Sequence, residues 1–101
     1  MIVTDIRYQP APLDMRGTGL RGWATATVNG MWVFDSLAVR RTADGRFVLS
    51  FPSRRDRSGA EYAYYRPTNA EVRQEIEAAV LEELDRRGFI VLPKTSDRRA
   101  P

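Results

Sequence analysis

The sequence contains neither cysteine nor histidine. The first absence excludes disulfides and thiolate metal sites, and the second removes the commonest metal ligand and proton shuttle. There is also no glycine-rich phosphate loop and no metal-ligand spacing, so the carboxylates do not form a credible catalytic set. We therefore expect a protein that is not an enzyme and needs no cofactor.

Long apolar runs are missing as well, since none approaches the roughly 18 residues that span a bilayer. The first residues are typical of a strand rather than of a signal peptide, which predicts a soluble, cytoplasmic protein without membrane contact. With 101 residues and 43% hydrophobic content, the chain suits one domain with one core. We place that domain at residues 1–92 and predict a disordered basic tail at 93–101.

Much of the first 65 residues alternates apolar and polar side chains with the period of β-strands. Asn29-Gly30 and residues 42–45 are turn signals typical of tight hairpins, whereas residues 13–20 suggest a flexible connection. In the first strand, alternation places Ile2 on the face of Ile6 and Tyr8, and Val3 on the other face. The expected strands are 2–8, 22–28, 32–40, 46–51 and 61–65, which form an antiparallel sheet of about five strands, largely a meander.

The period changes to that of a helix after residue 67. Thr68 and Glu71 have the spacing of a capping box, and Gly88 is the expected stop. The segment 89–92 is apolar and suits either a lid over the helix end or a small strand, in this chain or in a partner. The apolar stripe of the helix consists of Val72, Ile76, Ala79, Val80 and Leu84. The expected fold is α+β, with one C-terminal helix packed on the sheet.

Positive charge is concentrated between residues 40 and 68, where seven arginines face three carboxylates, whereas residues 69–88 are acidic. Arg54, Arg55 and Arg57 follow Pro52 in a short loop. One interpretation is a solvated hairpin whose charges keep the sheet soluble. The other is a phosphate-binding site, because a guanidinium binds phosphate through two parallel hydrogen bonds, although several must converge to give useful affinity. We expect Arg40, Arg41 and Arg46 at the opposite end of the shared strand.

Aromatic residues lie close to these arginines. Tyr62, Tyr64 and Tyr65 are able to stack on unpaired bases, but aromatic residues on a sheet covered by a helix usually belong to the core. Trp23 and Trp32 flank the Asn29-Gly30 turn, and we expect them to pack across strands or at a dimer contact.

The order of these elements resembles the SpoVG family, named for a stage V sporulation and septation protein. The resemblance covers roughly residues 1–85, and its most specific part is Gly45-Arg46-Phe47-Val48 followed by Phe51-Pro52-Ser53-Arg54-Arg55. Tyr65-Arg66-Pro67 before the helix also fits the family, whereas Phe34-Asp35-Ser36 stands where it usually has a histidine and an aspartate. The resemblance implies a homodimeric β-sheet protein with a C-terminal helix that binds DNA or RNA.

We therefore expect a regulator that binds DNA or RNA, with a role in gene regulation, sporulation or septation. Its phosphate contacts are expected at Arg54 and Arg55, helped by Arg57 and Arg66. The alternative is a protein-interaction or scaffold module, in which the sheet edge or the segment 89–92 recruits a protein partner and the arginines only solubilise the loop. The family implies a dimer, which would present the loop twice.

Overall fold

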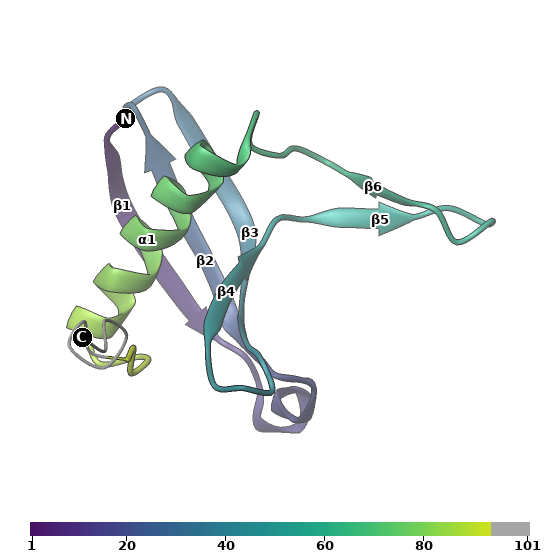
Figure 1. Ribbon diagram of the computed structural model, residues 1–101, viewed down its shortest axis with the longest axis horizontal. Helices are drawn as coiled ribbons and strands as arrows, with labels where there is room; N and C mark the ends of the chain where they lie inside the picture. Colours follow the sequence, from purple (N-terminus) through teal and green to yellow (C-terminus); the bar gives the residue numbers. More distant parts are fainter. Residues whose placement is uncertain (94–101) are drawn as a thin grey trace, which may run out of the picture.

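The computed structural model describes residues 1–93, so residues 94–101 of the expected basic tail lie outside the described part. Four strands form an antiparallel sheet in the order β1-β2-β3-β4, and one helix packs against it (Figure 1). This confirms the α+β class. The elements are β1 (Val3–Pro10), the 3-10 helix η1 (Leu13–Thr18), β2 (Leu20–Val28), β3 (Trp32–Arg41), β4 (Phe47–Ser50), β5 (Ser53–Arg55), β6 (Glu61–Ala63) and α1 (Ala70–Arg86).

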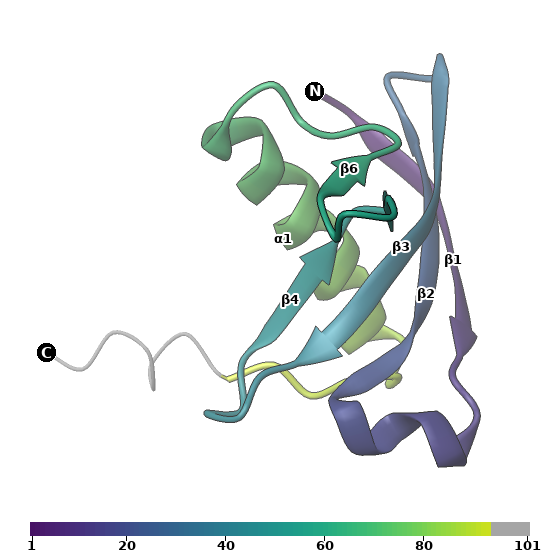
Figure 2. The same ribbon diagram turned by 90° about the vertical axis from the view of Figure 1, so that its right-hand side faces the viewer.

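Helix α1 covers one face of the four-stranded sheet, and the core lies between them (Figure 2). The predicted apolar stripe supplies Ile76, Val80 and Leu84 to this core, and Leu81 joins them. Strand β2 alternates buried and half-buried residues along its whole length, as expected for a strand with one covered face. The sheet contributes Ile6, Ala24, Ala26, Leu37, Val39 and Leu49. After the helix, Ile90 is buried, so this part of segment 89–92 closes over the domain's own core.

Strands β5 and β6 form a separate two-stranded sheet that projects from the body of the domain (Figure 1). The aromatic strand expected at 61–65 does form at its start, but it pairs with β5 rather than with the main sheet. The strands of the described residues therefore form one four-stranded sheet and one two-stranded sheet. We call residues 52–64 the arm.

The base of the arm is held by three aromatic rings. Phe51 and Tyr65, at its two ends, meet edge to face with ring centroids 5.8 Å apart, and both contact Phe34 of β3. The Tyr65 hydroxyl donates a hydrogen bond to the Asp35 carbonyl at 2.5 Å, and the Arg73 guanidinium lies over the Phe51 ring, 6.0 Å from its centroid. Both chain segments therefore leave the body from one fixed point.

Local details correct several expectations about the first half of the chain. Asp5 has a φ of 50°, and the register of β1 against β2 shifts between Thr4 and Arg7. This bulge turns Val3 toward the core and leaves Ile2 exposed, so the predicted face of the strand was wrong before the bulge. Residues 13–20 are not a flexible connection throughout, because η1 occupies most of them. The Asn29-Gly30 turn is confirmed, with φ of 56° and 64° and a hydrogen bond from the Met31 amide to the Val28 carbonyl.

The helix begins one residue later than the capping-box pattern indicated. Asn69, not Thr68, is the N-cap, and its side-chain oxygen accepts a hydrogen bond of 2.9 Å from the Val72 amide. At the other end, Gly88 has a φ of 85° just beyond the last helical residues, as expected for a stop. No helix in the described part of the chain is long and apolar enough to cross a membrane.

Candidate nucleic-acid interface

The arm is a β-ribbon whose register assigns each arginine to a face. Arg54 lies opposite Tyr62, and Arg55 lies opposite Glu61. Because successive side chains of a strand point to opposite faces, Arg54 and Arg55 project from opposite sides of the ribbon. The two arginines expected to act as one basic pair therefore cannot converge on a single phosphate within one chain.

The Arg55 face of the arm contains Ser53, Arg55, Glu61 and Ala63. The Ser53 hydroxyl donates to the Glu61 carboxylate at 2.5 Å, and an Arg55 guanidinium nitrogen lies 3.4 Å from the Gly59 carbonyl. Among residues 1–93, no ion pair involves Arg55. The guanidinium of Arg55 is therefore not paired with the Glu61 carboxylate, although Glu61 lies opposite it across the ribbon.

The turn at the tip of the arm is built around Asp56. Its carboxylate accepts hydrogen bonds from the Ser58 amide and hydroxyl and from the Ala60 amide, at 2.7 to 3.0 Å. These bonds, the Ser58 hydroxyl first, lower the pKa of Asp56 below its usual value. Arg57 lies in this turn and is exposed, and in the described part of the chain its side chain has no hydrogen-bond or ion-pair partner. The tip thus presents a free guanidinium on a constrained turn.

Arg66 lies at the base of the arm on the same side as Arg55. It lines a hollow of about 400 Å³ together with Ser53, Glu61, Ala63 and other residues. Arg73 of α1 lines the same hollow, although one of its nitrogens also donates to the Leu49 carbonyl at 2.8 Å. The structure therefore brings Arg55 and Arg66 to one side, with Arg73 beside them, and separates Arg54 from them.

Arg40 was expected at the far end of the sheet from the arm, together with Arg41 and Arg46. It instead lines a hollow of about 410 Å³ with Pro52 and Ser53 at the arm base. The sequence places Arg40 next to the turn at residues 42–45, and this position suggested the far end of the sheet. Its contact with the arm base depends on the pairing of β3 with β4, which the sequence does not show. Arg46 does lie at the far end, where it forms an ion pair of 3.1 Å with Asp44.

The tyrosines divide into two groups. Tyr62 and Tyr64 are 52% and 67% exposed, so the expectation that they belong to the core was wrong. Tyr65 does pack against the core. Its burial, and next the negative charge of Asp35, raise the pKa of Tyr65 to about 12. The exposed rings are placed to contact a base or a protein surface.

Trp23 and Trp32 do not pair across strands as expected. Trp23 lies opposite Ala38, and Trp32 lies opposite Val28 at the hairpin end. Trp32 is 61% exposed, whereas Trp23 is half-buried within the sheet. The two rings therefore belong to different surfaces.

Comparison with known proteins supports the order of elements described above. The sequence pattern of the SpoVG family matches residues 1–86. Two curated relatives carry the name "Putative septation protein SpoVG". One, from Macrococcus caseolyticus (strain JCSC5402), is 34% identical over 84% of this chain and 70% of its own length. The other, from Exiguobacterium sp. (strain ATCC BAA-1283 / AT1b), is 32% identical over 81% of this chain and 79% of its own length. The chain belongs to the SpoVG family.

Proposed function

We propose that this protein is a nucleic-acid-binding regulator whose arm contacts the phosphates of DNA or RNA. The observation that carries the proposal is a basic β-ribbon that stands away from the body of the domain. Arg55 and Arg57 lie on it and Arg66 lies at its base, and none of the three has an ion-pair partner among the described residues. The two nearby carboxylates, Asp56 and Glu61, are occupied by hydrogen bonds within the arm itself.

The shape of the arm also suits this function. A two-stranded ribbon is narrow enough to enter the major groove of a duplex, and exposed aromatic rings can stack on unpaired bases. Its rigid aromatic base fixes the direction of the ribbon, so that an encounter with nucleic acid costs little ordering of the chain. Phosphate contacts of this kind give affinity that falls steeply with salt and carry little sequence preference.

We further propose that two copies act together as a homodimer. One arm carries few phosphate contacts, and duplication of the arm would double them. Exposed apolar side chains on both faces of the sheet at the hairpin end of the domain offer an apolar surface for self-association. These are Met1, Ile2, Met31, Trp32 and Val33, which are 48% to 75% exposed.

The same apolar surface supports the alternative function, a protein-interaction module. Part of one sheet edge first considered for such a partner is engaged, because the Leu49 amide and carbonyl on the outer edge of β4 bond to Glu77 and Arg73 of the helix. In the segment after the helix, Ile90 and Leu92 pack on the domain's own core, whereas Phe89 and Val91 are 48% and 81% exposed. Retention on heparin that vanishes with modest salt favours nucleic acid, whereas indifference to polyanions and capture of a specific protein through the hairpin end favours this alternative.

A gel-shift titration with the double variant Arg54→Ala, Arg55→Ala tests the arm as a whole. We expect binding to weaken steeply, while circular dichroism and thermal unfolding stay as in the parent. Arg46→Ala is the matched control, because it removes one exposed arginine at the far end of β4. Binding as tight as the parent's at low and moderate salt would show that the arm is not the site. The names of the two relatives point to septation as the process in which to seek a target.

A further inference from the structure

The face of the main sheet that points away from α1 is not covered by any described element (Figure 2). The alternation of buried and accessible residues along the strands identifies the side chains on it. They are Arg7 and Gln9 of β1, Trp23, Thr25 and Thr27 of β2, Ala38 and Arg40 of β3, and Ser50 of β4. We call this surface the open face.

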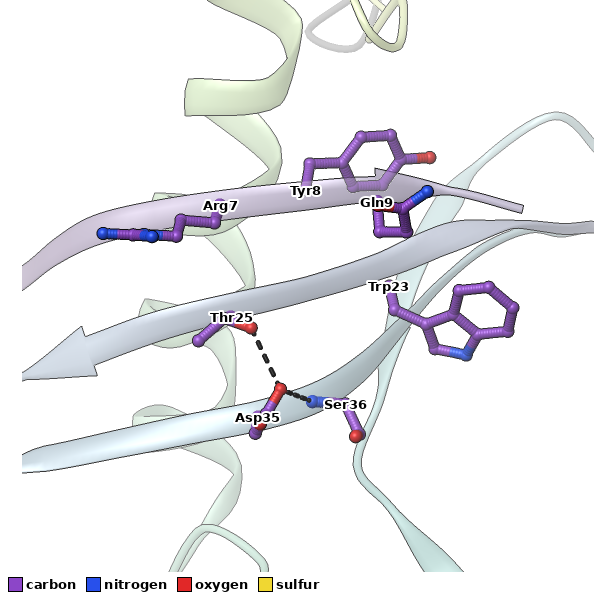
Figure 3. A pocket seen from close by; sticks show the side chains of 7 residues that line it. All are labelled: Arg7, Tyr8, Gln9, Trp23, Thr25, Asp35 and Ser36. Carbon is purple, nitrogen blue, oxygen red and sulfur yellow. Dashed lines mark hydrogen bonds between the residues drawn. The ribbon is translucent and has the colours of Figure 1, made fainter. Parts of the chain in front are cut away.

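Trp23 lies between two hollows on the open face. One, of about 230 Å³, is lined by Arg7, Gln9, Thr25 and Asp35 among others, and the other is the hollow of about 410 Å³ that contains Arg40 and Ser53. Trp23 is common to both. Figure 3 shows its indole beside the strands at one end of the first hollow, with Arg7 at the other end and α1 behind the sheet.

The hollows form a continuous series that ends at the arm. The second hollow shares Ser53 and Glu61 with a third, the hollow of about 400 Å³ at the arm base that contains Arg66. Arginines therefore stand at intervals from β1 across the sheet to the arm base. Asp35 is the carboxylate in the first hollow, and it is engaged by the Thr25 hydroxyl at 3.0 Å and the Ser36 amide at 2.8 Å.

We propose that the open face is a platform for single-stranded nucleic acid. In this arrangement one base stacks on the Trp23 indole, while Arg7 and Arg40 contact the phosphates on either side of that base. This inference rests on the proposed function and gives its site a second part. A shallow sheet face with a planar ring between spaced cations suits an unpaired strand, since bases in a duplex are stacked on one another and present no free face. The arginines favour a polyanion over a second copy of the same face, because two such faces would bring like charges together.

Tryptophan fluorescence provides the test, because the chain contains only Trp23 and Trp32. Trp32 is a control outside the platform, since it pairs with Val28, whose side chain is buried on the helix side. In the Trp32→Phe protein all indole emission comes from Trp23. We expect an unlabelled single-stranded oligothymidylate or oligouridylate to quench that emission, with the same midpoint as binding measured by anisotropy of a labelled strand.

Substitution measures the contribution of the ring. Trp23→Leu is expected to weaken binding of the single strand by about 5- to 150-fold, which corresponds to the usual range for loss of one base–aromatic stack. Leu13→Ala, the control at an apolar side chain of η1 that is 79% exposed and lines none of these hollows, is expected to leave binding unchanged. Thermal unfolding of each variant verifies the fold, and the quenching experiment tests the platform without altering Trp23 at all.

Two results would overturn the platform while leaving the proposed function intact. The first is arm-dependent binding of a single strand without quenching of Trp23 and without loss in Trp23→Leu. The second is a change in Trp23 emission with protein concentration alone, which would show that a second copy covers the open face. If the parent protein binds neither single strands nor duplexes at low salt, the proposed function itself fails, and the platform fails with it.

Discussion

Arg54 and Arg55 project from opposite faces of the arm, so they are expected to contribute differently to binding. If they acted as one basic pair, the loss of either would have a similar effect. Arg54→Gln and Arg55→Gln each remove one positive charge from neighbouring positions of the same strand. Arg55 shares its face with the hollow that contains Arg66, whereas Arg54 shares its face with Tyr62. Because phosphate binding needs several converging guanidinium groups, we expect Arg55→Gln to weaken binding much more than Arg54→Gln.

The size of the effect follows from counterion release. Each lost phosphate contact lowers the slope of log affinity against log salt by about 0.7 for a single strand and about 0.9 for a duplex. When salt rises from about 50 to 200 mM, one phosphate contact therefore accounts for about a 3-fold loss of affinity. The same contact in both arms of a dimer accounts for a loss of about 7- to 12-fold. We expect Arg55→Gln to remove this part of the salt dependence and Arg54→Gln to leave most of it in place.

Fluorescence anisotropy of a labelled oligonucleotide across that salt range measures the two slopes. Arg46→Gln serves as the control for one lost charge, because that residue lies at the far end of β4 and is paired with Asp44. Sedimentation velocity shows whether each variant keeps the parent's oligomeric state. Equal slopes for the two arm variants, or a larger loss in Arg54→Gln, would refute the assignment of the binding face.

Three predictions concern the fold. Because folding raises the pKa of Tyr65 to about 12, the protonated hydroxyl contributes stability that is complete below the unfolded pKa of about 10 and is lost as pH rises toward 12. Tyr65→Phe should therefore flatten the alkaline decline in the free energy of unfolding, and an unchanged decline would contradict this role of Tyr65. Gly22→Ala should destabilise the protein by about 1–3 kcal/mol, because a Cβ there would lie 2.5 Å from the Gln9 carbonyl oxygen; an unchanged melting temperature would contradict that crowding. Asn69→Ala should cost about 1 kcal/mol in urea unfolding and Thr68→Ala far less, and the reverse order would restore the capping box to Thr68.

Local features of the fold were predictable because they depend on neighbours in the chain. The Asn29-Gly30 turn forms where both residues adopt positive φ, which asparagine and glycine tolerate best. The helical period placed Ile76, Val80 and Leu84 in the core, and Gly88 ends the helix as its conformational freedom allows. Even here the N-cap was misplaced by one residue, because Thr68 and Asn69 are both capable of capping and the chain entering the helix selects between them.

The family and the composition of the basic segment could also be recognised from the sequence, but the site itself could not. Arg54 and Arg55 are adjacent in the sequence, and only the pairing of β5 with β6 shows that they face opposite ways. Arg40 lies at the arm base and Tyr62 is exposed to solvent. Both positions depend on which strands pair, β3 with β4 and β5 with β6. Strand pairing of this kind is set by which apolar faces can be buried together, and a local pattern does not contain that information.

The sequence by itself determined an antiparallel sheet with one C-terminal helix and a concentration of positive charge between residues 40 and 68, although it predicted about five strands in one sheet. Tertiary structure decided that the basic segment would leave the sheet as a free ribbon. The physical reason is the packing of Phe51 and Tyr65 against Phe34, which fixes both ends of the arm at one point of the body. It also decided that no element of residues 1–93 covers the second face of the sheet, because α1 packs on the other side.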